Sequence, residues 1–147
     1  MHPVHSPHAP HAFINPAQLY DPRPNGYTHV VVATMPARII HVAGQGGENA
    51  AGQLAASFET QVRQALANLG IALAAADATL RDVVKITVLI VDHDVDRLAV
   101  FSRLLGDAWG ANLPPACTLI PVARLALNGM LFEIEATAAC SLLAIPV

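Results

Sequence analysis

Charged side chains are scarce in this sequence. They make up 13% of its 147 residues, and eight Lys and Arg against eleven Asp and Glu give a formal net charge of −3. Binding of duplex nucleic acid needs clustered cations, so the composition argues against a nucleic-acid partner. The apolar fraction is 54%, and too few charges are available to coat the whole surface of a small domain. We therefore expect a buried subunit interface and a homo-oligomer.

Cysteines and long apolar runs are scarce as well. The two cysteines, Cys117 and Cys140, have neither the spacing of a disulfide framework nor that of a zinc site. Ala136–Val147, the longest uncharged apolar stretch near an end, is too short to span a bilayer. The first eleven residues lack the basic start and apolar core of a signal peptide. These absences predict a reduced, cytoplasmic protein without a membrane partner.

The length of the chain fits one domain with a sizeable core. We expect a His- and Pro-rich arm over residues 1–12, a single domain over 13–140 and a C-terminal tail over 141–147. The arm carries histidines at every third position: His2, His5, His8 and His11. Such a tract is typical either of weak metal binding or of a flexible arm. We favour the arm and predict no metal site, because no acidic or thiol ligands accompany the histidines.

The order of apolar segments predicts β-β-α-β-α-β-β. Two stretches with helical periodicity predict helices over Ala51–Ala76, with Ser57 as a cap, and over Asp94–Trp109 with Val95 facing inward. The five strands of this order are a hairpin of Tyr27–Thr34 and Ala37–Gly44, a central strand over Asp82–Val91 covered on both faces, and a second hairpin over Pro115–Ala138. A further short strand within Phe13–Tyr20 would precede them.

Two helices packed on one face of a mixed sheet make a two-layer α+β domain. The other face has no element left within the subunit to cover it, so we expect it to meet another copy. A Gly-rich segment, Gly44–Gly47, lacks the pattern of a phosphate-binding loop. Its glycines are expected to allow a tight turn or the close approach of a ligand or second chain.

The C-terminal hairpin carries two carboxylates, Glu133 and Glu135, on one face, because side chains two residues apart in a strand point the same way. Carboxylates in an otherwise apolar strand cost free energy unless they are paired or hydrogen-bonded. Either a structural role at an interface or a chemical role as a general base accounts for Glu135. Glu133 fits a structural role better.

Taken in order, these segments resemble the RidA/YjgF family, also called reactive-intermediate deaminases or L-PSP endoribonucleases. The resemblance runs from about Phe13 to Ala138; its motifs are weak singly but specific in their order. They are Tyr27 in GYTHV, Val42–Gln45 in VAGQ, Phe58–Leu69 in FETQVRQALANL, Asp82–Val88 in DVVKITV, Pro115, Val122–Leu125 in VARL and Glu133–Ala136 in EIEA.

This resemblance implies a chorismate-mutase-like fold and a homotrimer whose sheets form a central barrel. It also implies a small-molecule pocket in each cleft between neighbouring subunits. Family members with deaminase activity hydrolyse enamines and imines such as 2-aminoacrylate, and they need no metal or cofactor. The expected partners are therefore a small-molecule ligand and two further copies of the chain.

Five site residues follow from the resemblance alone. It implies that Glu135 positions or activates a water molecule and that Tyr27 is the pocket tyrosine. It further implies that Gly44 contacts the substrate through its backbone, between Ala43 and Gln45. Ala43 stands here where the family motif has serine.

The chain departs from the family at the residue that clamps the substrate carboxylate. The family pattern Pro-Ala-Arg-Ser is here Pro-Ala-Cys-Thr, so Cys117 replaces the arginine and Thr118 and Leu119 follow it. A thiol has neither the charge of arginine nor its two parallel N–H donors. Loss of the arginine–carboxylate contact costs a carboxylate substrate roughly 2–5 kcal/mol of binding free energy. Arg124, seven residues on, is expected to point from the opposite face of the strand.

Cys117 itself has three interpretations: a small hydrophobic residue, a contact for a less acidic ligand, or a nucleophile. We therefore predict either a deaminase or related hydrolase that acts on a substrate other than 2-aminoacrylate, or a non-catalytic trimer that binds a metabolite. An endoribonuclease ranks last, because eight cationic residues offer little to a phosphate chain.

Overall fold

The computed structural model describes residues 11–142, so the predicted arm and tail lie mostly outside the described residues. Its helices and strands are β1 (His11–Ile14), β2 (Val30–Ala33), β3 (Arg38–Gly46), α1 (Phe58–Ala74), β4 (Val83–Val91), α2 (Val95–Trp109), β5 (Ala116–Val122) and β6 (Phe132–Cys140). Two 3-10 helices, η1 (Arg23–Asn25) and η2 (Leu80–Asp82), precede β2 and β4. His11, predicted to belong to the arm, begins β1.

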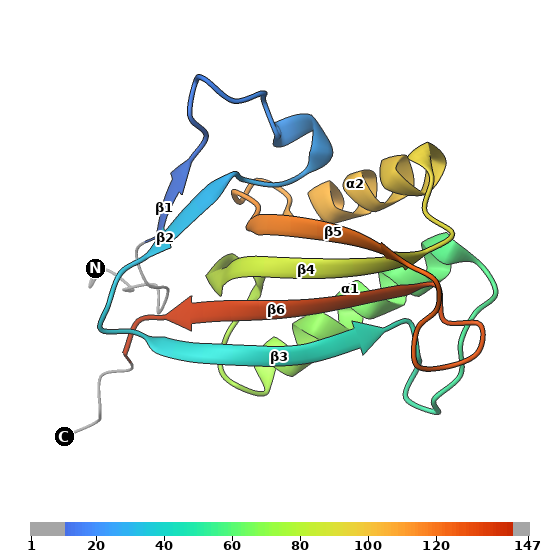
Figure 1. The fold of residues 1–147 in the computed structure, drawn as a ribbon. Helices are drawn as coiled ribbons and strands as arrows, with labels where there is room; N and C mark the ends of the chain where they lie inside the picture. Colours follow the sequence, from blue (N-terminus) through green and yellow to red (C-terminus); the bar gives the residue numbers. More distant parts are fainter. Residues whose placement is uncertain (1–10, 143–147) are drawn as a thin grey trace.

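Four strands form one mixed sheet in the order β3-β6-β4-β5, in which only the β4–β5 pair is parallel. Both helices pack on the same face of this sheet (Figure 1). β1 and β2 form a separate antiparallel ribbon. The predicted two-layer α+β fold with two helices on one face is therefore confirmed.

Both predicted hairpins are wrong in their strand pairing. β5 and β6 do not pair, because β4 lies between them: Thr87 is opposite Thr118 on one side and Glu135 on the other. β2 and β3 belong to different sheets, because β1 takes the hydrogen bonds of β2 and β6 takes those of β3. The short connections between these strands suggested hairpins, but each strand instead forms its hydrogen bonds with strands that are more distant in the sequence.

Helix α1 begins at Phe58, seven residues later than predicted. The side chain of Asn49 accepts hydrogen bonds from the amides of Ala51 and Gln53 at 3.0 Å each, and this turn keeps those amides out of a helix. Ser57 caps the helix as predicted, because its hydroxyl accepts the amide of Thr60 at 3.2 Å.

Helix α2 begins where Asp94 accepts the amide of Arg97 at 2.8 Å. Its inner face buries Phe101, Leu105 and Trp109. Val95, predicted to face inward, is 79% exposed. It lies in the first turn, beside Pro24, and not over the sheet.

Alternate residues of the central strands face opposite sides of the sheet. The side towards the helices buries the core residues Ile86, Val88, Ile90, Phe132, Ile134 and Ala136. We call the other side the open face; it carries Lys85, Thr87, Leu89, Glu133, Glu135 and Thr137. No element of residues 11–142 covers it, so β4 is central, as predicted, but has only one covered face.

Within residues 11–142, no helix is long and apolar enough to cross a membrane.

Candidate functional site

A cavity of about 320 Å³ lies between β5, α2 and the segment before β2. We call it the Cys117 cavity. Its lining combines apolar, aromatic and uncharged polar side chains: Tyr20, Asn25, Tyr27, His93, Leu98, Phe101, Cys117 and Leu119. Cavities of this size and mixture are the usual form of a small-molecule site.

The backbone around Thr28 joins Tyr27 to the start of β5. Thr28 donates its amide to the carbonyl of Pro115 at 3.0 Å and its hydroxyl to that of Pro114 at 2.6 Å. Thr28 is also bridged to Ala116, the residue before Cys117. These contacts bring the predicted pocket tyrosine to the cavity that Cys117 lines.

Three aromatic rings, those of Tyr20, Tyr27 and His29, pack together at this side of the cavity, and the two tyrosines line it. The hydroxyls of Tyr20 and Tyr27 are hydrogen-bonded to each other. The ring of His29 packs edge-on against both, with centroids 5.0 Å from Tyr20 and 5.4 Å from Tyr27. His29 Nε2 donates to the carbonyl of Tyr20 at 2.8 Å, which holds the loop before β2 against the wall.

His93 is a lining residue that sequence reasoning missed. It stands in the turn between β4 and α2, after Asp92, which has a left-handed φ of 48°, and before the cap residue Asp94. Its Nδ1 is buried and has no hydrogen-bond partner within residues 11–142. The sequence analysis predicted no role for this histidine, and nothing in the sequence placed its imidazole in the cavity that Tyr27 and Cys117 line.

The thiol of Cys117 is half-buried and faces the helices. Burial raises its pKa to about 11, and the nearby charge of Lys85 acts in the opposite direction. A thiol with such a high pKa is almost entirely protonated at neutral pH and is a weak nucleophile. Among the three interpretations of Cys117, burial of the thiol and its raised pKa therefore favour a hydrophobic residue or a ligand contact over a nucleophile.

Glu135 lies elsewhere, in a hollow of about 130 Å³ on the open face. Thr87, Leu89 and Glu133 line the hollow with it. The two carboxylates do share one face of β6, as their spacing predicted. We call this the Glu135 hollow.

A third group of predicted residues, Ala43, Gly44 and Gln45, forms a bulge in the edge strand β3. A Cβ on Gly44 would lie 1.8 Å from Oε1 of Glu133, so the glycine leaves room for that carboxylate. Gly47 similarly admits the backbone of Gln61, whose Cα would lie 2.6 Å from an added Cβ. Within the subunit, these glycines thus serve close packing of the chain on itself.

The predicted site residues are therefore divided within one chain. Tyr27, Cys117 and Leu119 share the Cys117 cavity. Thr118 points to the open face, where it accepts a hydrogen bond from Nζ of Lys85 at 2.6 Å. Glu135 lies on that same open face, and the bulge in β3 lies at the far edge of the sheet from β5.

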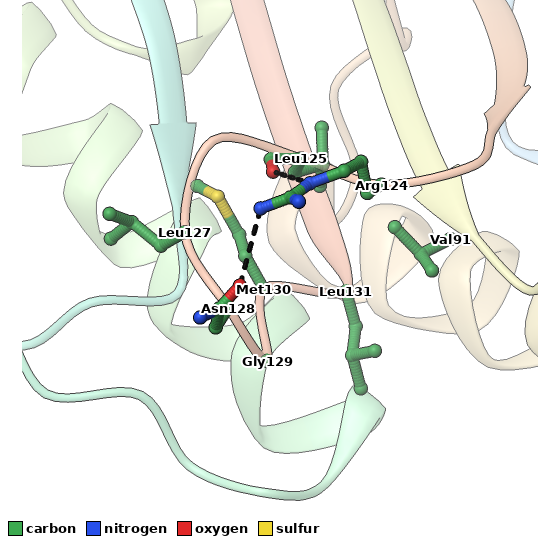
Figure 2. A pocket seen from close by; sticks show the side chains of 8 residues that line it. All are labelled: Val91, Arg124, Leu125, Leu127, Asn128, Gly129, Met130 and Leu131. Atoms are coloured by element: carbon green, nitrogen blue, oxygen red, sulfur yellow. Dashed lines mark hydrogen bonds between the residues drawn. The ribbon is translucent and has the colours of Figure 1, made fainter.

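Arg124 does not replace the missing clamp. It lies in the loop after β5 and not on the strand, so the expectation that it points from the opposite face of that strand is wrong. Its Nη2 donates to Oδ1 of Asn128 at 3.2 Å, across its own loop (Figure 2). The 280 Å³ pocket beside it shares no lining residue with the Cys117 cavity.

Comparison with known proteins identifies the family. Residues 21–140 match the family model described as endoribonuclease L-PSP. A comparison with curated proteins gave no match.

Solved structures of the same family are similar to this chain. YyfB from Yersinia pestis, described as a protein of unknown function of the conserved Rid family, is 38% identical; the alignment covers 87% of this chain and 97% of that one, with a TM-score of 0.83. The YjgF product of E. coli is 29% identical, with coverages of 71% and 83% and a TM-score of 0.63. RidA from an Antarctic Psychrobacter is 26% identical, with coverages of 76% and 86% and a TM-score of 0.63. This chain belongs to the Rid/YjgF family of endoribonuclease L-PSP proteins.

Proposed function

We propose that this protein is an imine or enamine hydrolase whose active sites form between copies of the chain. The observation that carries the proposal is the division of the candidate site. The Cys117 cavity and Glu135 lie on opposite faces of one sheet, so a single chain does not bring them together. A neighbouring copy that places its own Glu135 at the mouth of this cavity completes the site.

The open face supports such an assembly. Leu89 is half-buried on it, and Ile39 and Ile120 are each 43% exposed. A sheet face with apolar residues and no cover among the described elements gains from burial against another copy. We propose the closed homotrimer that the family resemblance implies, because cyclic symmetry buries the same face of every copy.

In the proposed reaction, Glu135 acts as the general base. It takes a proton from water as the water oxygen bonds to the imine carbon, and the nitrogen receives a proton. The resulting carbinolamine gives up its hydroxyl proton, its nitrogen takes up a proton, and the C–N bond breaks, which leaves a carbonyl compound and ammonia. The overall reaction consumes one water molecule and needs no redox partner.

The cavity itself argues against a clamped carboxylate. Among residues 11–142, the eight that line the cavity include no Lys or Arg, and Lys85 extends on the other face of the sheet to Thr118. We therefore propose a substrate other than 2-aminoacrylate. If the rest of the pocket is intact, Cys117→Arg should confer or raise hydrolysis of 2-aminoacrylate; no gain would show that other walls of the pocket have diverged as well.

The proposal is tested by ammonia release from a panel of neutral and carboxylated imines. Glu135→Gln should lower the rate at least about 100-fold, the usual contribution of a general base. Glu133→Gln is the matched control, because this neighbour lies in the same hollow but has no proposed catalytic role, and it should retain most of the activity. Equal rates for wild-type and Glu135→Gln protein on every substrate would overturn the proposal.

A binding trimer without catalysis is the second candidate. The neutral thiol in place of a cationic clamp favours it. It predicts that neutral metabolites raise the melting temperature while no member of the imine panel releases ammonia. A screen in which no compound changes the melting temperature would count against this candidate.

A further inference from the structure

Arg124 carries a guanidinium that is exposed and that forms no ion pair with a carboxylate of residues 11–142. Its Nη2 donates to Oδ1 of Asn128 at 3.2 Å and its Nε to the carbonyl of Leu125 at 3.4 Å. Both acceptors are neutral, and both distances exceed the about 2.7–2.9 Å that is usual between a charged donor and a carboxylate. Arg63, by contrast, forms an ion pair with Glu59 at 2.8 Å. A guanidinium has more N–H donors than the two bonds of Arg124 use, so it can still bind an anion.

Apolar side chains surround this cation. The 280 Å³ pocket beside it, which we call the Arg124 pocket, is lined by Arg124, Asn128, Gly129 and five aliphatic or thioether side chains, those of Val91, Leu125, Leu127, Met130 and Leu131. Figure 2 shows the guanidinium among them, with Val91 and Leu131 on one side and Leu127 on the other. Leu127 is 47% exposed, so a ligand that bonds the guanidinium can also cover apolar surface.

The frame of the Arg124 pocket is fixed by hydrogen bonds outside it. The fully buried side chain of Gln61 in α1 donates to the carbonyl of Gly129 at 2.8 Å and accepts the amide of Leu131 at 2.8 Å. Val91 donates its amide to the carbonyl of Leu131 at 3.0 Å, which joins the loop to the end of β4. Gly129 has a left-handed φ of 82°, as the turn of the loop requires. A ligand would therefore meet a preformed site and would not have to order the loop.

The lining selects the charge of the ligand. Among the described residues that line the pocket, Arg124 is the one cation, and none is Asp or Glu. One guanidinium matches one carboxylate, whose two oxygens accept parallel N–H bonds. A phosphate dianion would bring a second negative charge without a partner, and an uncharged molecule would gain the apolar contact alone. The pocket thus fits a single carboxylate attached to a short apolar chain.

We propose that the Arg124 pocket binds a small monocarboxylate, with its carboxylate on the guanidinium and its apolar chain against Leu127 and Leu131. This site goes beyond the proposed hydrolase and does not depend on it. The Arg124 pocket shares no lining residue with the Cys117 cavity or with the Glu135 hollow. The protein would then have a ligand site for carboxylates apart from the cavity that lacks a cationic clamp.

Three compounds test the proposal in the full-length protein. Hexanoate has both the carboxylate and the apolar chain, hexanamide has the chain without the charge, and acetate has the charge with hardly any chain. We expect hexanoate to bind at least about tenfold more tightly than either of the others in NMR titrations at pH 7 and low salt, because it alone makes both contacts. It should also shift the Nε resonance of Arg124.

Equal affinity for acetate and hexanoate would indicate an adventitious ion only. Equal affinity for hexanamide and hexanoate would show that the charge of Arg124 plays no part. Either result would overturn the inference.

Substitutions separate the charge of the pocket from its apolar wall. Arg124→Gln removes the charge and should lower the affinity for hexanoate at least about tenfold, while Arg124→Lys keeps the charge without the parallel donors and should lower it less. Leu127→Ser should weaken hexanoate but not acetate. Arg63→Gln is the matched control, because Arg63 is an exposed arginine outside the pocket, and it should leave the affinity unchanged. Unchanged affinity in the Arg124→Gln protein would overturn the inference.

Sedimentation velocity and ammonia release separate this site from the subunit interface and from the hydrolase. The Arg124→Gln protein should keep the oligomeric state and any ammonia release of the wild-type protein while it loses hexanoate. Dissociation of this variant to monomers would show that the guanidinium pairs with a carboxylate of another copy, and would overturn the inference. Selective hexanoate binding without ammonia release from any imine would support the inference and contradict the hydrolase alone.

Discussion

The covered face and the open face of the four-stranded sheet are made by alternate residues of the same strands, yet one forms the hydrophobic core and the other carries carboxylates. On β6, Phe132 and Ile134 are fully buried against the helices, while Glu133 and Glu135 between and after them face outward. The covered face supplies the stability of the subunit. The open face carries the carboxylates, and the Cys117 cavity lies on the opposite side of the sheet from them. A site that needs both must be completed by a second copy.

Loss of assembly is the largest effect that we expect from a single substitution on the open face. Leu89→Glu adds a third carboxylate to the hollow that contains Glu133 and Glu135. Like charges at a buried interface repel and lose hydration, so the oligomer should dissociate to monomers at micromolar concentration in analytical ultracentrifugation. Ile71→Glu, on the exposed side of α1 where Ile71 is 69% exposed, should remain assembled. An intact oligomer in the Leu89→Glu protein would show that the open face is not the interface.

The covered face should be most sensitive in its core. Phe132 is fully buried and packs against the rings of Phe58 and Phe101 at centroid distances of 6.1 and 5.7 Å. Phe132→Ala should lower the free energy of unfolding by about 4 kcal/mol, because it removes a large apolar side chain and leaves a cavity. Glu133→Ala, one residue further on the open face, should change it by less than about 1 kcal/mol. Urea denaturation at one fixed protein concentration measures both, and similar losses would contradict the contrast between the faces.

Substitutions of Gly47 and Gly44 also test the contrast between the side of the sheet that packs on α1 and the open face. A methyl group on Gly47 would meet the backbone of Gln61, which cannot move away without shifting α1, so Gly47→Ala should cost about 3 kcal/mol. On Gly44 it would meet the carboxylate end of Glu133, a flexible side chain, so Gly44→Ala should cost only about 1 kcal/mol. Gly70→Ala in α1 has open space and should stabilise the protein slightly. Melting curves that reverse the order of Gly47 and Gly44 would refute this account.

A smaller effect is expected on the rate at which the thiol of Cys117 is alkylated. Its pKa is raised from 9.0 to about 11 because burial disfavours the thiolate. At pH 8 its thiolate fraction should be about 100-fold lower than that of an ordinary thiol, and alkylation by iodoacetamide should quicken about tenfold per pH unit until near pH 11. Mass spectrometry of the alkylated Cys117 peptide measures the rate. Rapid alkylation at pH 7 would restore the nucleophile interpretation.

Much of the fold was predictable because local signals agree with it. The apolar run of β4, the periodicity of α2 and the cap at Ser57 each depend on residues close in sequence. The start of α1 was not predictable from propensity, because the Ala-rich segment before it favours a helix while the side chain of Asn49 captures its amides. Strand neighbours also escaped prediction, since the insertion of β6 between β3 and β4 is a long-range event.

The candidate site was predictable in part. The family resemblance predicted that Tyr27, Cys117 and Leu119 are pocket residues, and all three line the Cys117 cavity. It said nothing of His93, because that residue reaches the cavity through the turn after β4 and has no counterpart in the motifs. Nor did the sequence show that Cys117 and Glu135 face opposite sides of the sheet, which depends on how β5 and β6 each align with β4.

Subunit complementation tests the central claim most directly. Leu119→Trp fills the Cys117 cavity and Glu135→Gln removes the proposed base, so each variant alone should release almost no ammonia from imines on which the wild-type protein is active. If every site combines a cavity from one copy with Glu135 from another, refolding an equal mixture should restore about one quarter of the wild-type rate, because random assembly pairs two intact halves in that proportion. A mixture as inactive as the separate variants would contradict a shared site and show that each chain works alone.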